Sequence, residues 1–126
     1  MEMIEEKLEL NSRFFRVNLL QLENAVVAFM FEERVRMGTI AIAMPGTGEV
    51  AVGRSSVLVG GKYLMTTRAL AERLAAKTGK MALVSLFTEL DETEALRMYA
   101  KLVEKIPASS QPESRMHISD LVGENA

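Results

Sequence analysis

The chain has 126 residues, of which 48% are hydrophobic, and 17 acidic against 15 basic side chains give it a formal net charge of −2. This length suits a single domain with a real core, and the acidic balance argues against a protein that binds nucleic acid through many phosphate contacts. The sequence contains no cysteine, so disulfides and thiolate zinc sites are excluded.

The amino-terminal stretch MEMIEEKLEL contains four glutamates and one lysine. A secretory signal would instead have a basic start and an apolar block. The apolar run AVVAFMF at 25–31 is far shorter than the roughly 20 residues that span a bilayer. We therefore expect a cytoplasmic protein with no membrane partner.

The first half of the chain has the hydrophobic pattern of β-strands. We expect strands at 14–22, 25–31, 38–44 and 49–59. The break at Glu23 and Asn24 is typical of a hairpin, because Asn tolerates positive φ, and PGTG at 45–48 is a turn sequence. The simplest arrangement of these four strands is antiparallel.

The second half of the chain changes to helical spacing. Its first helix is expected at 66–78, with Gly79 as a left-handed C-terminal cap. A strand follows at 81–87, and a second helix starts at Asp91, where Glu94 completes a capping box, and ends before Pro107. The apolar face of this helix consists of Leu96, Tyr99, Leu102, Val103 and Ile106.

This order of elements predicts an α+β domain at 1–106. It has an antiparallel sheet of five to six strands with two helices on one face, followed by a polar, flexible tail at 107–126. The tail begins with the proline-punctuated polar segment PASSQPES at 107–114 and has few apolar residues. We therefore expect the folded unit to end at the second helix.

Three expected strands, AVVAFMF, TIAIAM and MALVSLF, are apolar on both faces. An antiparallel sheet with one wet face should alternate apolar and polar residues, and two helices cover one face only. We therefore expect a dimer in which sheet face meets sheet face. The candidate interface residues, whose strand parity the sequence leaves open, are Val27, Phe29, Phe31, Ile40 and Ile42. The alternative is a monomer in which the charged first strand or the tail covers that face.

Motifs for catalysis are weak. The Gly-Lys pair of VGGKY at 59–63 does not make a P-loop. That motif needs Gly at the position of Ser56, and Ser or Thr at the position of Tyr63. His117 lies in the tail without a second ligand or a nucleophile, and the acidic group around Asp91 is explained by helix capping. We expect no enzymatic activity, no cofactor and no metal.

Positive charge is concentrated between Gly60 and Lys80. Five basic residues against Glu72 alone give this segment a charge of 5 − 1 = +4, and they are Lys62, Arg68, Arg73, Lys77 and Lys80. One interpretation is a solvated helix face whose C-terminal cations complement the helix dipole. The other is a docking face for an acidic partner.

The segments GTIAIAM, RSSVLVGG and ALAERLAAKTGKMALVSL, followed by a closing helix, resemble the proteasome assembly chaperones of types 3 and 4. The resemblance covers about 38–106 and is closest to type 4. It is carried by Leu70, Ala71, Arg73, Leu74, Ala75, Lys77, Thr78 and Lys80 ahead of an apolar strand.

The resemblance implies a non-catalytic chaperone without a cofactor, formed by sheet-to-sheet pairing into a homodimer, or into a heterodimer with a related chaperone. Its partners would be α-type subunits of the 20S proteasome, whose ring assembly it would assist. Two alternatives stay open. One is a dimeric scaffold of the roadblock or longin kind. The other is a small-ligand-binding protein, for which Tyr63, Arg54 and Ser56 are the suggestive set.

Overall fold

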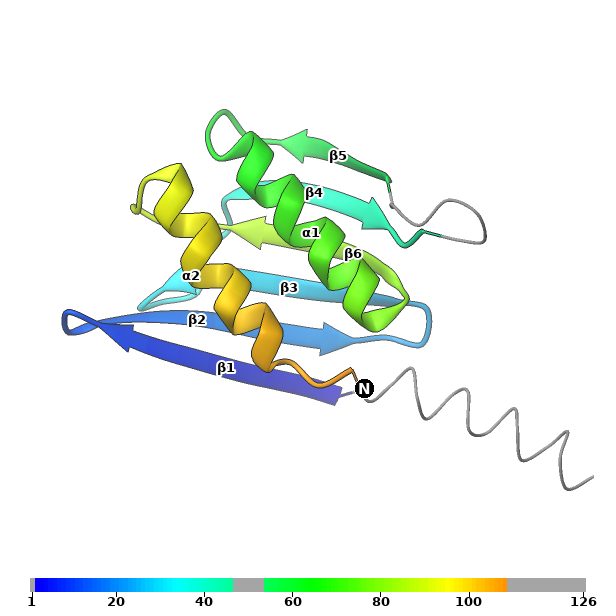
Figure 1. Ribbon diagram of the computed structural model, residues 1–126, viewed down its shortest axis with the longest axis horizontal. Coiled ribbons are helices and arrows are strands. Elements are labelled where there is room, and N and C mark those ends of the chain that lie inside the picture. The colour runs from blue at the N-terminus through cyan, green and yellow to red at the C-terminus, as the bar shows by residue number, and fades with distance from the viewer. Residues whose placement is uncertain (1, 47–53, 109–126) are drawn as a thin grey trace, which may run out of the picture.

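The computed structural model describes residues 2–46 and 54–108 and shows one sheet covered on one side by two helices (Figure 1). The elements, in chain order, are β1 (Glu2–Leu10), β2 (Arg13–Gln21), β3 (Ala25–Glu32), β4 (Thr39–Met44), β5 (Arg54–Val59), α1 (Leu64–Thr78), β6 (Met81–Leu86) and α2 (Glu92–Lys105). The α+β class and the two-helix layer expected from the sequence are confirmed. Residues 49–53 of the expected fourth strand and 109–126 of the tail lie outside the described residues.

The sheet has six strands in the order β1-β2-β3-β6-β4-β5. Every neighbouring pair is antiparallel except β3 and β6, which are parallel. The expectation of an antiparallel sheet is therefore wrong for this one pair. The reason is the crossover through α1, which returns the chain along the sheet after β5, so that β6 enters between β3 and β4 in the direction of β3.

The two amino-terminal hairpins differ in their turns. Asn11 and Ser12, between β1 and β2, have φ values of 53° and 65°, as both central residues of a type I′ turn require. The second hairpin is closed by the Leu22 amide, which donates to the carbonyl of Ala25 at 2.8 Å. The hairpin expected at Glu23 and Asn24 is therefore confirmed, although Asn24 is not among the described residues with positive φ.

The C-terminal cap of α1 and the N-terminal cap of α2 are the residues that the sequence predicts. The α1 C-cap, Gly79, has a φ of 73° and donates its amide to Ala75 at 2.8 Å. At the start of α2, the Asp91 carboxylate accepts from the Glu94 amide at 2.8 Å. Helix α1 begins two residues earlier than expected, because the Tyr63 carbonyl accepts the Thr67 amide at 2.9 Å.

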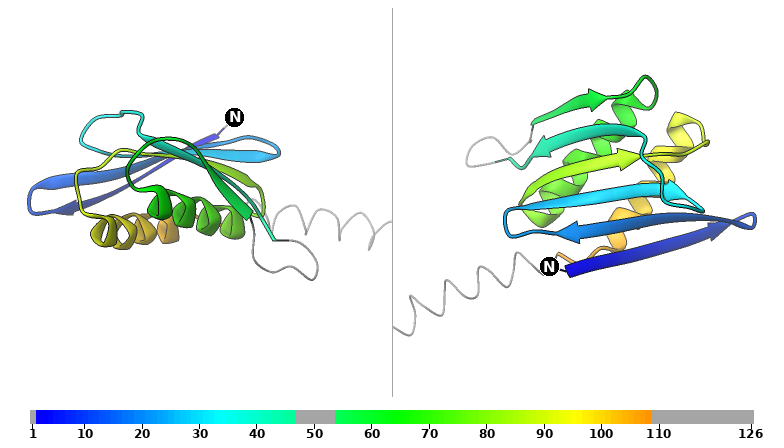
Figure 2. Two further views of the ribbon diagram at one scale, coloured as in Figure 1. Left: turned by 90° about the horizontal axis from the view of Figure 1, so that it is seen from above. Right: turned by 180° about the vertical axis from the view of Figure 1, so that it is seen from behind.

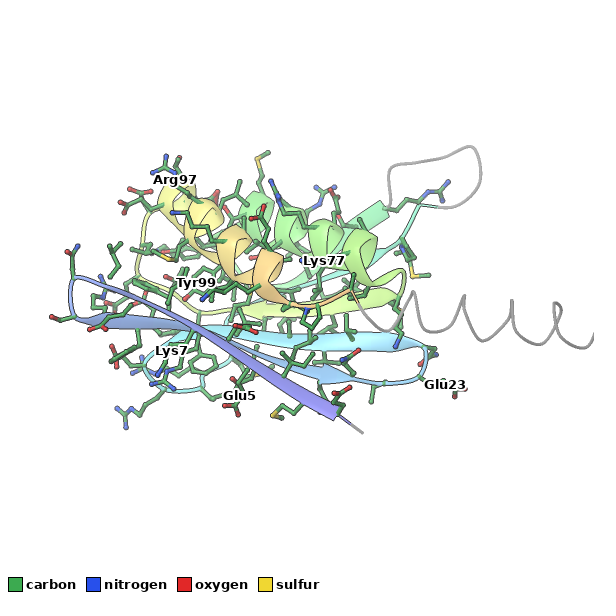
Figure 3. All side chains as sticks on the ribbon, turned by 60° about the horizontal axis from the view of Figure 1, so that its bottom comes forward. Glu5, Lys7, Glu23, Lys77, Arg97 and Tyr99 are labelled. Carbon is green, nitrogen blue, oxygen red and sulfur yellow. The ribbon has the colours of Figure 1, made fainter. Side chains whose placement is uncertain are left out.

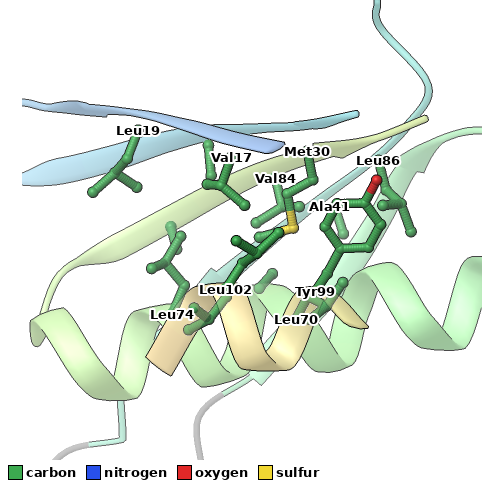
Figure 4. Close-up of a cluster of buried hydrophobic side chains, with 14 of the residues drawn as sticks. Val17, Leu19, Met30, Ala41, Leu70, Leu74, Val84, Leu86, Tyr99 and Leu102 are labelled. Carbon is green, nitrogen blue, oxygen red and sulfur yellow. The ribbon is translucent and has the colours of Figure 1, made fainter. Parts of the chain in front are cut away.

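The core lies between the helices and one face of the sheet (Figures 2 and 4). Helix α1 packs over β4, β6 and β5, and α2 packs over β2 and β1. Tyr99 meets Phe15 edge-on, with ring centroids 6.1 Å apart. On α2, Ala95 is buried and Leu96 only half-buried, because Ala95 and not Leu96 lies in helical register with Tyr99 and Leu102. Leu96 packs against the edge of the core and is not at its centre.

Candidate functional site: an apolar sheet face

The face of the sheet opposite the helices is covered by no helix or strand of the described chain, as the view from above in Figure 2 shows. On the other face, alternate side chains of the same strands, such as Val26, Ala28 and Met30 of β3, are fully buried under the helices. The strand pairing therefore resolves the parity that the sequence left open. It places Val27, Phe29 and their neighbours on the helix-free face.

A continuous apolar row crosses the middle of this face. Strand register pairs Leu20 with Val27, Val27 with Leu83, and Leu83 with Ile42, so that four adjacent strands each contribute one apolar side chain. All four side chains are half-buried. Such a row is a large apolar surface left partly in contact with water.

The next row along the strands contains Phe29, Ser85 and Ile40. Ser85 is fully buried, and its hydroxyl accepts the amide of Gly38 at 2.9 Å. This bond fixes the β3–β4 connection, which rises above the helix-free face in Figure 2. On the edge strand β5, Leu58 and Val59 are 55% and 59% exposed.

The five candidate interface residues lie on this face with different exposures. Val27, Phe29, Ile40 and Ile42 are half-buried. Phe31 has the same strand parity but is only 2% exposed, so a partner could cover little more of it. The first strand does not cross the face, because β1 pairs with β2 at the edge of the same sheet. A monomer in which the first strand covers this face is therefore ruled out. A monomer in which the tail covers it would involve residues outside the described ranges.

One end of the helix-free face carries cations above aromatic rings, which sequence reasoning missed. The Lys7 ammonium lies 5.1 Å and the Arg16 guanidinium 5.4 Å from the ring centre of Phe14, and Figure 3 shows Lys7 on the side away from the helices. Arg36 lies 4.8 Å from the ring centre of Phe87. The Nε of Arg16 is buried without a hydrogen-bond partner within the described chain. Register partners such as Lys7 and Arg16 meet only once β1 and β2 are paired.

The basic residues of the Gly60–Lys80 segment are spread along α1 and do not form one cluster. Lys77 donates to the carbonyl of Glu104 at 2.6 Å, next to α2 (Figure 3). Lys80 donates to the carbonyl of Leu22 at 2.9 Å, and Arg68 donates to the Ser55 hydroxyl at 3.1 Å. The acceptor of Lys77 is a carbonyl in the last turn of α2, where helix carbonyls lack intrahelical partners.

The other two candidate basic residues stand apart from these contacts. The Lys62 ammonium lies 5.5 Å from the ring centre of Tyr63. Arg73 is exposed and makes no ion pair within the described ranges. Of the five, Arg73 is the residue whose charge is most available to a partner.

The suggestive ligand-binding set does not converge. Tyr63 is buried, and its hydroxyl donates to the carbonyl of Leu90 at 2.5 Å, on the side of the helices. Arg54 and Ser56 are register partners of Met44 and Ile42 and lie on the opposite face of the sheet. Across the described ranges no three His, Cys, Asp or Glu side chains are grouped as a metal site requires. His117 lies outside those ranges.

A buried carboxylate ties the carboxyl end of β3 to the connection before α2. Glu32 accepts hydrogen bonds from the Thr88 hydroxyl, from the Glu89 amide at 2.8 Å and from the Arg13 guanidinium. Burial acts to raise the pKa of Glu32, but these donors outweigh it and hold the pKa below its ordinary value. The hydrogen bond to Glu32 in turn raises the pKa of Arg13. We interpret the network as structural, since it joins the start of β2, the end of β3 and the segment after β6, away from the apolar rows.

The fold and this face together define a small α+β domain with an apolar sheet surface that no helix or strand of the described chain covers. Neither helix in the described part of the chain is long and apolar enough to cross a membrane. No protein-family model and no curated protein sequence matches the chain.

The fold has a match among solved structures. It is similar to a chain in the crystal structure of a chaperone complex for yeast 20S proteasome assembly, with a TM-score of 0.63 and 10% sequence identity. The likeness covers 83% of this chain and 98% of that chain. At this identity the likeness shows a shared fold.

Proposed function

We propose that the protein is a non-catalytic proteasome assembly chaperone that acts as a dimer. The observation that carries the proposal is the fold likeness to the yeast chaperone complex, which extends over nearly the whole of that chain. The uncovered apolar sheet face adds a second, independent reason to expect protein binding. In this proposal the chain binds α-type subunits of the 20S proteasome in the cytoplasm and assists assembly of the α ring.

The dimer forms through the helix-free sheet faces. Six strands about 4.8 Å apart and about 20 Å long have a planar area of roughly 500 Å² per copy. Two copies therefore bury at most on the order of 1,000 Å², the lower limit for a specific interface, since the β3–β4 connection occupies part of the face. Val27, Phe29, Ile40 and Ile42 supply the apolar centre, and Phe31, on the same face but only 2% exposed, adds little contact area.

The client binds the surface that remains outside such a dimer. With the sheets facing each other, the helices of both copies point outward (Figure 2). Arg73 is our first choice for a contact with an acidic client surface, and the dispersed residues Lys62, Arg68, Lys77 and Lys80 are secondary candidates. The partner copy is an identical chain or a related chaperone.

Dimerisation is tested by light scattering on the purified chain at several concentrations. Ile42→Arg and Leu58→Arg each place a charge on the helix-free face and should weaken the dimer at least about tenfold. Ala76→Arg is the matched control, because Ala76 is exposed on α1. Circular dichroism checks that all three variants fold. A monomeric wild-type chain, or a dimer that only Ala76→Arg weakens, would contradict dimerisation through the helix-free face.

The client is tested by native mass spectrometry of the gently purified protein. The proposal predicts a dimer carrying α-type proteasome subunits in substoichiometric complexes. Companions from trafficking or GTPase complexes would instead favour the roadblock or longin kind of scaffold. A bound small molecule without protein companions would favour a ligand-binding protein.

A further inference from the structure

Three hollows meet at one exposed methionine on the outer side of the helix layer. Met65, in the first turn of α1, is 76% exposed. It lines hollows of about 570, 260 and 240 Å³, the second of which continues between α1 and α2 toward Ala69 and Leu96. A long, unbranched side chain in contact with three depressions can adapt to an inserted group.

The backbone that carries Met65 is firmly held. Tyr63 has a φ of 58°, and its hydroxyl is fixed to the carbonyl of Leu90. The Thr67 hydroxyl donates to the Tyr63 carbonyl at 2.6 Å, and the Thr66 hydroxyl lies 3.2 Å from the Glu92 carboxylate. The start of α1 is therefore bonded to the start of α2, and the exposure of Met65 belongs to an ordered surface.

The rim of the largest hollow is acidic. Glu89, Asp91 and Glu92 line it against Lys62 alone, which gives a local charge of −3 + 1 = −2. Glu89 is an exposed rim charge: its side chain is 76% exposed, and its only ion pair within the described ranges is a long one to Arg13, at 4.0 Å. An apolar centre with a negative rim favours a partner that is apolar in the middle and positive at its edges.

We propose that the Met65 hollow binds a segment of another protein that presents one aliphatic side chain flanked by Lys or Arg. The aliphatic group enters between Met65 and the α1–α2 groove, and the cations lie against Glu89 and Asp91. The site is on the helix layer and stays open when the sheet faces are paired, so it does not rest on the proposed chaperone function. It also differs from the basic surface around Arg73, about 12 Å further along α1 at 1.5 Å per residue.

The test uses three synthetic heptapeptides and the isotope-labelled full chain. The first has a leucine between two pairs of lysines, the second replaces the leucine by glycine, and the third replaces the lysines by glutamates. Chemical shifts of backbone amides are followed during titration. We expect the first peptide to shift amides of 64–69 and 89–93, with a dissociation constant near or below about 1 mM, and the other two to bind at least about tenfold more weakly.

Two variants locate the binding. Met65→Gln should weaken binding of the first peptide at least about fivefold, because it replaces the apolar centre by a polar group of similar length. Leu22→Gln is the control, since Leu22 is an exposed apolar residue in the turn between β2 and β3 and lines none of these hollows, and should leave binding unchanged. Equal binding of the acidic peptide, shifts elsewhere, no binding, or Met65-dependent contact between copies of this chain would overturn the proposal. Failure of the first peptide to bind would leave the outcome of the dimer and client tests unchanged.

Discussion

The Glu32 network gives a stability prediction whose size can be worked out bond by bond. In Glu32→Gln the side-chain shape is kept, and the amide oxygen still accepts from Thr88 and the Glu89 amide. Hydrogen bonds to a charged group contribute about 1.5–3 kcal/mol and neutral ones about 0.5–1.5 kcal/mol, so each of these two bonds loses about 1 kcal/mol. The Arg13 side chain is 42% exposed, so its pairing adds only about 0.5–1 kcal/mol.

We therefore expect Glu32→Gln to lower the free energy of unfolding by about 2–3 kcal/mol at pH 7. The measurement is urea unfolding followed by circular dichroism, at one fixed protein concentration because a dimer is stabilised by mass action. Glu89→Gln is the matched control. It removes an exposed carboxylate next to the same arginine, 4.0 Å away, and should change stability by less than about 0.5 kcal/mol.

The same variant has a defined pH signature. The pKa of Glu32 is lowered from its ordinary value of 4.5 in the folded chain, so its ionised form stabilises the fold above that pH. The stabilisation is lost as the pH falls below 4.5 through the folded-state pKa. The difference between wild type and Glu32→Gln should shrink over that range. A difference below about 0.5 kcal/mol at neutral pH, or one that does not change in acid, would refute the account of this network.

Two further changes test the packing. Tyr99→Phe removes the hydroxyl that donates to the Phe31 carbonyl at 2.9 Å, and should cost about 1–2 kcal/mol of unfolding free energy in the same urea assay; an unchanged midpoint would contradict this bond. Gly38→Ala would place a Cβ 2.0 Å from the carbonyl oxygen of Leu86, whereas Gly61→Ala meets nothing within 4 Å. The first should cost several kcal/mol, on the order of 3 or more, and the second less than about 1 kcal/mol; equal thermal midpoints for these two variants would rule out the close approach at Gly38.

The sequence predicts elements well where the signal is local. Gly79 and Asp91 mark helix ends through their own backbone and side-chain chemistry, which needs no distant partner. The turn at Asn11 and Ser12 is not predicted, because the glutamates before it obscure the strand pattern of β1. Edge strands such as β1 commonly carry charged residues, which prevent further strand pairing.

The position of β6 could not be predicted from strand pattern. Val26 and Val27 are equally apolar, so nothing in β3 distinguishes the helix side from the open side or marks β6 as its neighbour. The same limit applies to the polar contacts. Glu32 looks like part of the charged stretch EERVR, and its donor Thr88 lies 56 residues away. Lys77 has the composition of a docking residue, but its acceptor is a carbonyl 27 residues further on.

The insertion of β6 also sets the order in which the chain can assemble as it is synthesised. Before residues 81–86 are available, β1, β2 and β3 form one meander and β4 and β5 form a separate hairpin. Both units then have an unpaired inner edge, at β3 and at β4, and an open strand edge is a template for pairing with other chains. Strand β6 closes both edges at once. A nascent chain that stops before Met81 therefore has two separate sheets, each with an open strand edge that can pair with other chains. Strand β6 joins them into one domain.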